Sequence, residues 1–164
     1  QRSSAMSILI PEAPIVSLCG SPEETEALGT QLAAKLQGGS VIALHGDLGA
    51  GKTVIARGIA RGLGIQSAVT SPTFTVVQEY LGNVWTLYHI DLYRLSSEDD
   101  AIAFGIEDFL ADRSAITILE WAERLPTLLP AETVHITLER VRETERRITQ
   151  QQGRPASSKP SEQQ

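Results

Sequence analysis

One stretch of the chain, from Val41 to Gly62, constrains the fold more than any other. It begins with the apolar run Val41–Leu44, continues through the glycine-rich loop Gly46–Thr53 and ends in the helix-compatible run Val54–Gly62. The loop fits the pattern G-x-x-x-x-G-K-[ST], which holds phosphate groups when it joins a strand to a helix. Its glycines let backbone N–H groups face phosphate oxygens, and the start of the next helix adds a positive dipole. The stretch therefore predicts a strand, a phosphate-binding loop and a helix.

Two residues at the end of this loop have separate expected roles. Lys52 would reach the β- and γ-phosphates, and the hydroxyl of Thr53 would bind Mg²⁺. We expect the nucleotide to contact the loop and the residue after it, namely Gly46, Asp47, Leu48, Gly49, Ala50, Gly51, Lys52, Thr53 and Val54. The chain has no Asn-Lys-x-Asp run of the kind that reads guanine, so ATP or ADP with Mg²⁺ is the expected cofactor.

Composition narrows the class of protein. A length of 164 residues suits one domain, and a net charge of -6 argues against broad, unaided binding to a nucleic-acid backbone. Cys19 is the only cysteine, which excludes an internal disulfide and fits a reducing compartment. The sequence shows no membrane span, no secretory signal and no Cys–His cluster for a structural zinc. We expect a cytoplasmic protein.

The chain divides into three parts. We expect residues 1–14 to be an N-terminal extension or a cloning scar, residues 15–148 to form the domain, and residues 149–164 to be a disordered tail rich in Gln, Ser and Pro. Within the domain, Ser21 has the pattern of a helix N-cap, followed by Pro22 at the first helical position.

The remaining strands are predicted from apolar and β-branched runs. A turn at Gly82-Asn83 separates Thr75–Tyr80 from Val84–Ile90, which predicts an antiparallel hairpin. Ala115–Leu119 has the pattern of a buried strand, and the alternating run Thr133–Leu138 that of the last strand. We therefore predict an α/β fold: a single P-loop NTPase-like domain with a mixed parallel and antiparallel central sheet flanked by helices.

Two carboxylates are candidates for the chemistry beside the loop. Hydrolysis needs an acidic group near Mg²⁺ and a group that orients water, and such residues usually end a buried strand. Glu120 follows the run with the clearer pattern of a buried strand and is the first candidate for holding Mg²⁺ or orienting water. Asp91 follows the second strand of the predicted hairpin. The alternatives are a solvent-facing charge for Glu120 and a structural ion pair with Arg94 for Asp91.

Neighbouring side chains add weaker signals. Trp121 could contact the base or brace the site, and His89 could act as a base, although a satisfied structural histidine is favoured. Ser71-Pro72-Thr73-Phe74 could form a switch that senses the γ-phosphate, or an ordinary loop. Two sets of arginines have a solvated face as their default interpretation: Arg57 and Arg61 on the predicted helix, and Arg140, Arg142, Arg146 and Arg147 interleaved with glutamates.

Four motifs in series resemble the TsaE (YjeE) family, whose members are bacterial ATPases of tRNA threonylcarbamoyladenosine synthesis. They are Gly46–Thr53, Ser71–Phe74, His89–Arg94 and Glu120-Trp121, and the resemblance extends over about Ile15–Leu138. It implies weak Mg²⁺-dependent ATPase activity, with TsaB and TsaD as partners that carry out the transfer and bring in the tRNA. It further implies that Thr53, Asp91 and Glu120 are the Mg²⁺ and catalytic residues, that Trp121 is a functional aromatic residue and that Ser71–Phe74 is a switch.

Two other functions remain open from the residues alone. A small-molecule kinase could use the same loop, although no Arg-rich lid follows it. A nucleotide-gated binding module would need no useful turnover. The sequence also leaves open which of Asp91 and Glu120 lies nearer the metal.

Overall fold

The structure, a computed structural model, describes residues 13–47, 49–70 and 76–153. Leu48 and the predicted switch Ser71–Phe74 lie outside the described residues. The elements, in chain order, are β1 (Ile15–Cys19), α1 (Pro22–Ala33), β2 (Val41–His45), α2 (Lys52–Gly62), β3 (Val77–Leu81), β4 (Thr86–Asp91), α3 (Glu98–Phe104), α4 (Ile106–Leu110), β5 (Ala115–Glu120), a 3₁₀ turn (Ala122–Arg124), β6 (Val134–Arg140) and β7 (Arg146–Gln152).

The strands form one seven-stranded mixed sheet in the order β1-β7-β6-β2-β5-β4-β3. Strand β2 pairs in parallel with β5 and β6, and β4 pairs in parallel with β5. The two outer portions are antiparallel: β3 with β4, and β1 and β6 with β7. The predicted α/β class, the mixed sheet and the hairpin are confirmed.

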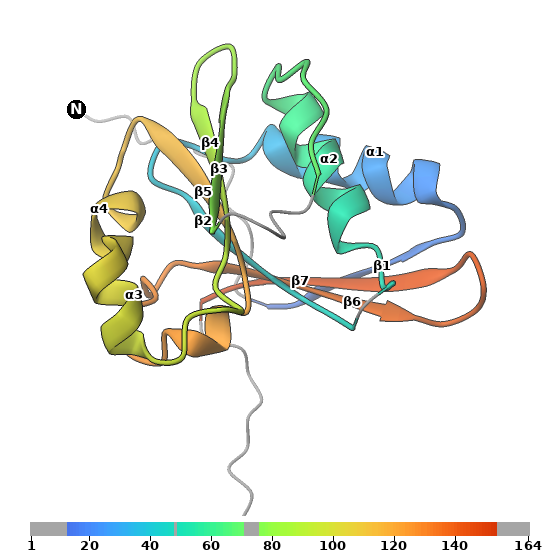
Figure 1. Cartoon of the computed structure of the whole chain (residues 1–164). Coiled ribbons are helices and arrows are strands. Elements are labelled where there is room, and N and C mark those ends of the chain that lie inside the picture. The colour runs from blue at the N-terminus through green and yellow to red at the C-terminus, as the bar shows by residue number, and fades with distance from the viewer. Residues whose placement is uncertain (1–12, 48, 71–75, 154–164) are drawn as a thin grey trace, which may run out of the picture.

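Helices cover the sheet on both faces (Figure 1). On one face, α1 and α2 pack against a core that includes Ile42, Leu44 and Ile118. On the other, α3, α4 and the 3₁₀ turn pack against Ala43 and Leu119. All six residues of β5 are buried, because a central strand covered on both faces has no solvent-facing side.

Glycines allow α1 and α2 to pack closely. A Cβ on Gly58 of α2 would lie 2.1 Å from the carbonyl oxygen of Glu26 in α1, and one on Gly29 would lie 2.5 Å from the carbonyl oxygen of Ile55. The start of α1 follows the prediction: the Ser21 side chain accepts a hydrogen bond from the Glu24 N–H, and Pro22 takes the first helical position.

The C-terminal boundary of the domain was predicted wrongly. Strand β7 follows the supposed last strand and runs to Gln152, so residues 149–152 belong to the sheet. Ile148 is fully buried and Gln150 is 6% exposed, and β7 hydrogen-bonds to β1 on one side and β6 on the other. The pairing with β1 joins residues far apart in sequence, whereas β6 and β7 form a hairpin. The polar composition of β7 gave no sign of either pairing.

Candidate nucleotide-binding site

The phosphate-binding loop joins the carboxyl end of β2 to the amino end of α2, as predicted. Gly46 has φ +150° and Gly51 has φ +107°, conformations that favour glycine. A Cβ on Gly46 would also lie 2.7 Å from the carbonyl oxygen of Leu138 in β6. The helix α2 begins at Lys52 without a side-chain cap, so its first N–H groups remain available for an anion.

A cavity of about 910 Å³ opens at this end of the sheet. It brings together residues from three separate motifs: Lys52 and Thr53 from the loop, Asp91 from β4, and Glu120 at the end of β5 with Trp121 directly after it. The predicted nucleotide contacts Gly46, Asp47, Gly49, Gly51 and Val54 also line it. Ala50 differs, because its side chain is buried in the core and does not line the cavity.

The two carboxylates end neighbouring parallel strands. Asp91 and Glu120 are register partners of the β4–β5 pairing, so both side chains reach the edge of the sheet where the loop lies. Ligands of open α/β sheets bind at this carboxyl edge. Asp91 is half-buried and accepts a hydrogen bond from the Tyr93 N–H at 3.0 Å, whereas Glu120 is buried.

His89 is the buried partner of Glu120. Its Nε2 lies 2.8 Å from Oε2 of Glu120, and its side chain is fully buried. Burial alone would raise the pKa of Glu120, but the hydrogen bond and charge of His89 and the charge of Lys52 outweigh burial and lower that pKa. Glu120 is therefore held as a carboxylate at neutral pH. The contact does not agree with a solvent-facing Glu120. It pairs only Nε2 of His89, because the buried Nδ1 has no hydrogen-bond partner among the described residues.

An aromatic group lies at the edge of the cavity. Trp121 is 40% exposed and has φ +65°, the left-handed region that a bulky residue seldom adopts. Its ring centroid is 4.8 Å from that of Tyr93, and the guanidinium carbon of Arg124 lies 5.4 Å from the centroid of the Trp121 ring. The Arg124 Nη2 donates to the Tyr93 carbonyl oxygen at 3.1 Å, which links the 3₁₀ turn to the end of β4.

Sequence reasoning missed several residues that line the cavity, namely His45, Tyr93, Glu123 and Arg146. His45 directly precedes Gly46, and its Nε2 lies 2.9 Å from Nδ1 of His135 on the adjacent strand β6. Tyr93 lies two positions after Asp91, so nearness in sequence could have drawn attention to both His45 and Tyr93. Arg146 is almost a hundred residues from the loop, and no local signal marks it.

The arginines with glutamate neighbours divide into two groups. Arg142 pairs with Glu145 at 3.3 Å and Arg147 with Glu139 at 3.1 Å, as a solvated face with mixed charges would. Arg146 departs from that interpretation, because its guanidinium contacts the phosphate-binding loop.

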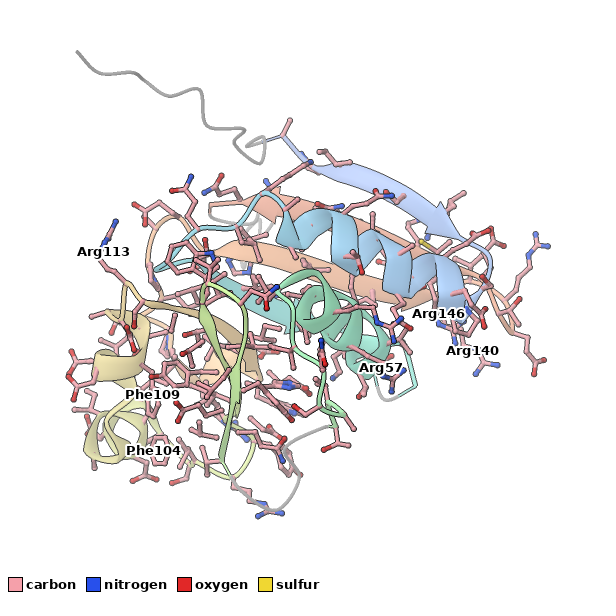
Figure 2. All side chains as sticks on the ribbon, turned by 90° about the horizontal axis from the view of Figure 1, so that it is seen from above. Arg57, Phe104, Phe109, Arg113, Arg140 and Arg146 are labelled. Atoms are coloured by element: carbon pink, nitrogen blue, oxygen red, sulfur yellow. The ribbon has the colours of Figure 1, made fainter. Side chains whose placement is uncertain are left out.

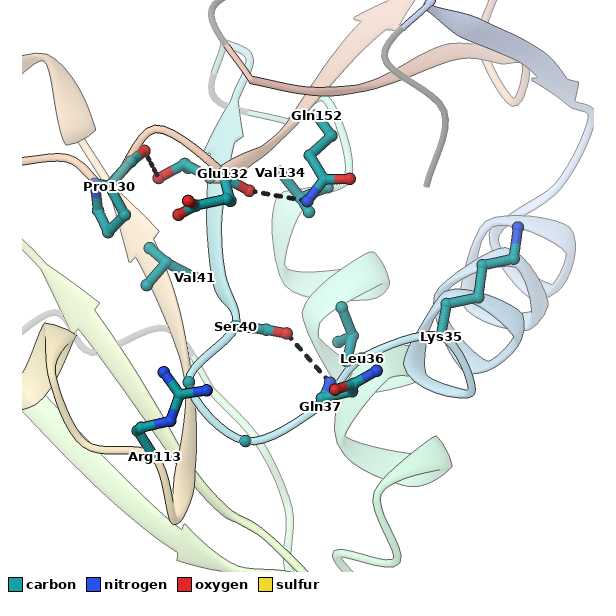
Figure 3. Close-up of a pocket in the computed structure, with 13 residues that line it drawn as sticks. Lys35, Leu36, Gln37, Ser40, Val41, Arg113, Pro130, Glu132, Val134 and Gln152 are labelled. Atoms are coloured by element: carbon teal, nitrogen blue, oxygen red, sulfur yellow. Dashed lines mark hydrogen bonds between the residues drawn. The ribbon is translucent and has the colours of Figure 1, made fainter. Parts of the chain in front are cut away.

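A second cavity, of about 370 Å³, lies at the opposite edge of the sheet, beside the start of β2 (Figure 3). Lys35 and Arg113 lie on different sides of it, and the Ser40 hydroxyl accepts a hydrogen bond from the Gln37 N–H. None of the predicted site residues that the structure describes lines this cavity. The cavity at the loop is therefore the candidate site.

The donor set in that cavity fits Mg²⁺. The ion prefers oxygen ligands and is commonly held by one or two carboxylates together with phosphate and water. Thr53 offers a hydroxyl, Asp91 and Glu120 offer carboxylates, and Glu120 is held in its charged form.

Within the described residues, no helix has the length and hydrophobicity needed to cross a membrane.

Comparison with known proteins agrees with this arrangement. The family model "Threonylcarbamoyl adenosine biosynthesis protein TsaE" matches residues 19–148. A "tRNA threonylcarbamoyladenosine biosynthesis protein TsaE" of Bacillus subtilis is 42% identical over 129 residues, which cover 79% of this chain and 80% of the relative. The protein of the same name from Mycobacterium leprae is 38% identical over 138 residues, which cover 80% of this chain and 86% of the relative.

A solved structure shares the fold as well. The crystal structure of YdiB from Bacillus subtilis superposes with a TM-score of 0.73 at 35% identity, covering 86% of each chain. Because the family model covers most of the chain, and the Bacillus subtilis relative is 42% identical over 129 residues, the chain belongs to the TsaE family.

Proposed function

We propose that this chain binds ATP with Mg²⁺ and hydrolyses it slowly, as the energy-coupling subunit of threonylcarbamoyl transfer to tRNA. The observation that carries the proposal is the single cavity that joins Lys52 and Thr53 to Asp91 and the buried Glu120. Family membership supports the pathway. The modification chemistry itself would be carried out by TsaD with TsaB, and tRNA would be reached through that complex.

Each residue has a physical task in this proposal. Lys52 offsets the negative charge of the β- and γ-phosphates, and the free N–H groups at the start of α2 bind phosphate oxygens. Mg²⁺ would be held by Thr53 with Asp91 or Glu120, and would neutralise charge that develops on the phosphates. Glu120, fixed by His89, is positioned to orient the attacking water or to complete the metal site.

Coupling to partners follows from the difference between ATP and ADP. A nucleotide can shift a partner's conformation only by as much as its affinities for the two states differ. Exposed Trp121 and Tyr93 beside the cavity are suited to report which nucleotide is present. The Ser71–Phe74 segment stays a proposed switch, and the net charge of -6 agrees with an indirect contact to tRNA.

The test measures ATP turnover alone and with TsaB and TsaD, together with multiple-turnover transfer of the threonylcarbamoyl group. We expect stimulation by the partners, lost in Lys52→Ala and Glu120→Ala. Lys35→Ala is the matched control, because Lys35 lies at the second cavity. Phosphate that appears on an added acceptor would indicate a small-molecule kinase. Nucleotide-dependent partner binding that survives in Glu120→Ala without turnover would indicate a gated binding module.

A further inference from the structure

Arg146 ties the turn between β6 and β7 to the phosphate-binding loop. Its guanidinium donates only to backbone carbonyl oxygens in the described part of the chain: Ala50 at 3.1 Å, Gly49 at 3.3 Å, Arg142 at 3.1 Å, Glu143 at 3.2 Å and Glu145 at 3.2 Å. None of the ion pairs found among those residues includes it. Figure 2 shows Arg146 with Arg57 and Arg140 at the end of the molecule away from Phe104 and Phe109.

The direction of these contacts matters for phosphate binding. In a planar trans peptide the C=O and the following N–H point in opposite directions. When the Ala50 carbonyl oxygen accepts from Nε of Arg146, the N–H of Gly51 must point away from the guanidinium. The Gly49 carbonyl oxygen fixes the preceding peptide in the same way, and the Ala50 N–H turns back to the Asp47 carbonyl oxygen at 2.9 Å.

We infer that Arg146 is a positioning residue that presets the phosphate-binding loop before a nucleotide arrives. A guanidinium suits this task because it presents five donors in a rigid fork and stays charged at every physiological pH. Nε and Nη2 engage the loop, while Nη1 is anchored on the turn at residues 142–145. The positive charge also polarises the two loop peptides, which strengthens their N–H groups as donors.

The inference rests on the proposed function for its link to nucleotide, and it has a test that does not need nucleotide. Hydrogen exchange is measured in the nucleotide-free full chain at the backbone amides of Ala50 and Ile55, which donate to the carbonyl oxygens of Asp47 and Gly51. In Arg146→Ala we expect these amides to exchange about tenfold faster, the factor that one or two lost hydrogen bonds would give. Arg147→Ala is the matched control, because Arg147 is the next residue on β7 and points to the opposite face of the sheet.

Nucleotide binding supplies the second measurement, with fluorescent ATP and ADP analogues. Arg146→Ala should weaken both by the same factor, about tenfold, and raise KM while leaving kcat within about twofold of the wild type. A loss for ATP with ADP unchanged would place the guanidinium on the γ-phosphate and overturn the positioning role. If the wild type binds neither analogue, the proposed function fails, while the exchange measurement still decides the role of Arg146.

Three further outcomes would overturn the inference. Exchange of the Ala50 and Ile55 amides in Arg146→Ala at the wild-type rate would show that the loop holds its shape without the guanidinium. Wild-type exchange and affinity in Arg146→Lys would show that charge alone suffices and the fork is not needed. The thermal unfolding midpoint of each variant is recorded, and exchange that rises throughout the sheet would indicate global destabilisation and also contradict a local role.

Discussion

His89 Nε2 lies 2.8 Å from Oε2 of Glu120, and the two side chains are buried on the neighbouring strands β4 and β5. The contact holds the carboxylate at the carboxyl edge of the sheet, where the phosphate-binding loop begins. Glu120 is thus fixed by the fold before any nucleotide is present, as preorganised electrostatic catalysis requires.

Replacing His89 tests that relationship. In His89→Ala the carboxylate keeps its burial and loses its donor, so the pKa of Glu120 should rise and the free energy of unfolding should fall by about 1–3 kcal/mol. Urea denaturation measures the loss of stability, and the pH dependence of ATP turnover reports the rise in the pKa of Glu120. His89→Gln keeps an N–H donor and should recover part of both, whereas wild-type stability and turnover in His89→Ala would contradict the account.

The stacked pair His45 and His135 predicts how stability depends on pH. Burial is the main cause that lowers the pKa of both imidazoles from the ordinary value of 6.5. Below pH 6.5 the two imidazoles take up protons in the unfolded chain, whereas in the folded protein they stay neutral until a lower pH. The neutral pair therefore makes its full contribution to folding stability above pH 6.5. That contribution is lost as the pH falls below 6.5 and passes through the lower pKa values of the folded state.

The measurement compares the free energy of unfolding at about pH 7.5 and about pH 5.5. The wild type should lose more stability than His135→Gln, which has one imidazole fewer to protonate on unfolding. Equal losses in the two chains would show that the pair does not contribute to the pH dependence.

Gly58 should respond to alanine against the usual helix preference. Within a helix, alanine is normally favoured over glycine by about 1 kcal/mol. Here a Cβ would meet the Glu26 carbonyl oxygen at 2.1 Å, so α1 must move and we expect a loss of about 1–3 kcal/mol. Gly20→Ala is the control, since its Cβ has ordinary contacts at 3.6 Å. Stabilisation of Gly58→Ala in thermal unfolding would disprove the close helix contact.

Replacing Trp121 should reduce partner-stimulated turnover and leave stability nearly unchanged. Its left-handed backbone costs about 1 kcal/mol or more, which glycine would relieve. The partly exposed ring contributes packing that glycine would lose. We expect Trp121→Gly to stay within about 1 kcal/mol of wild-type stability while partner-stimulated turnover falls at least about tenfold. A large loss of stability with normal stimulation would make the ring a structural brace instead.

The parts of the fold that sequence could predict are those with local signals. The phosphate-binding loop, the capped helix α1, the β3–β4 hairpin and the buried strand β5 each follow from a short run of residues. Strand β7 could not be predicted, because its polar residues become a strand through pairing with β1 and β6.

The site shows the same division. Lys52, Thr53, Asp91 and Glu120 each lie in a motif or at a strand end, and the structure brings them to one cavity. In the sequence, Arg146 lies among glutamates, a pattern that indicates a solvated surface. Its contact with the loop depends on the position of β7 in the sheet. His135 is likewise recognisable only once β2 and β6 are paired.

Multiple-turnover threonylcarbamoyl transfer to tRNA by TsaD and TsaB tests the energy-coupling role of this chain most directly. The transfer is measured with ATP and Mg²⁺ in the presence of the wild type or Glu120→Gln. We expect repeated turnover with the wild type and a single round, at most, with Glu120→Gln. Equal repeated turnover with either chain, or without this protein, would contradict the proposed coupling role.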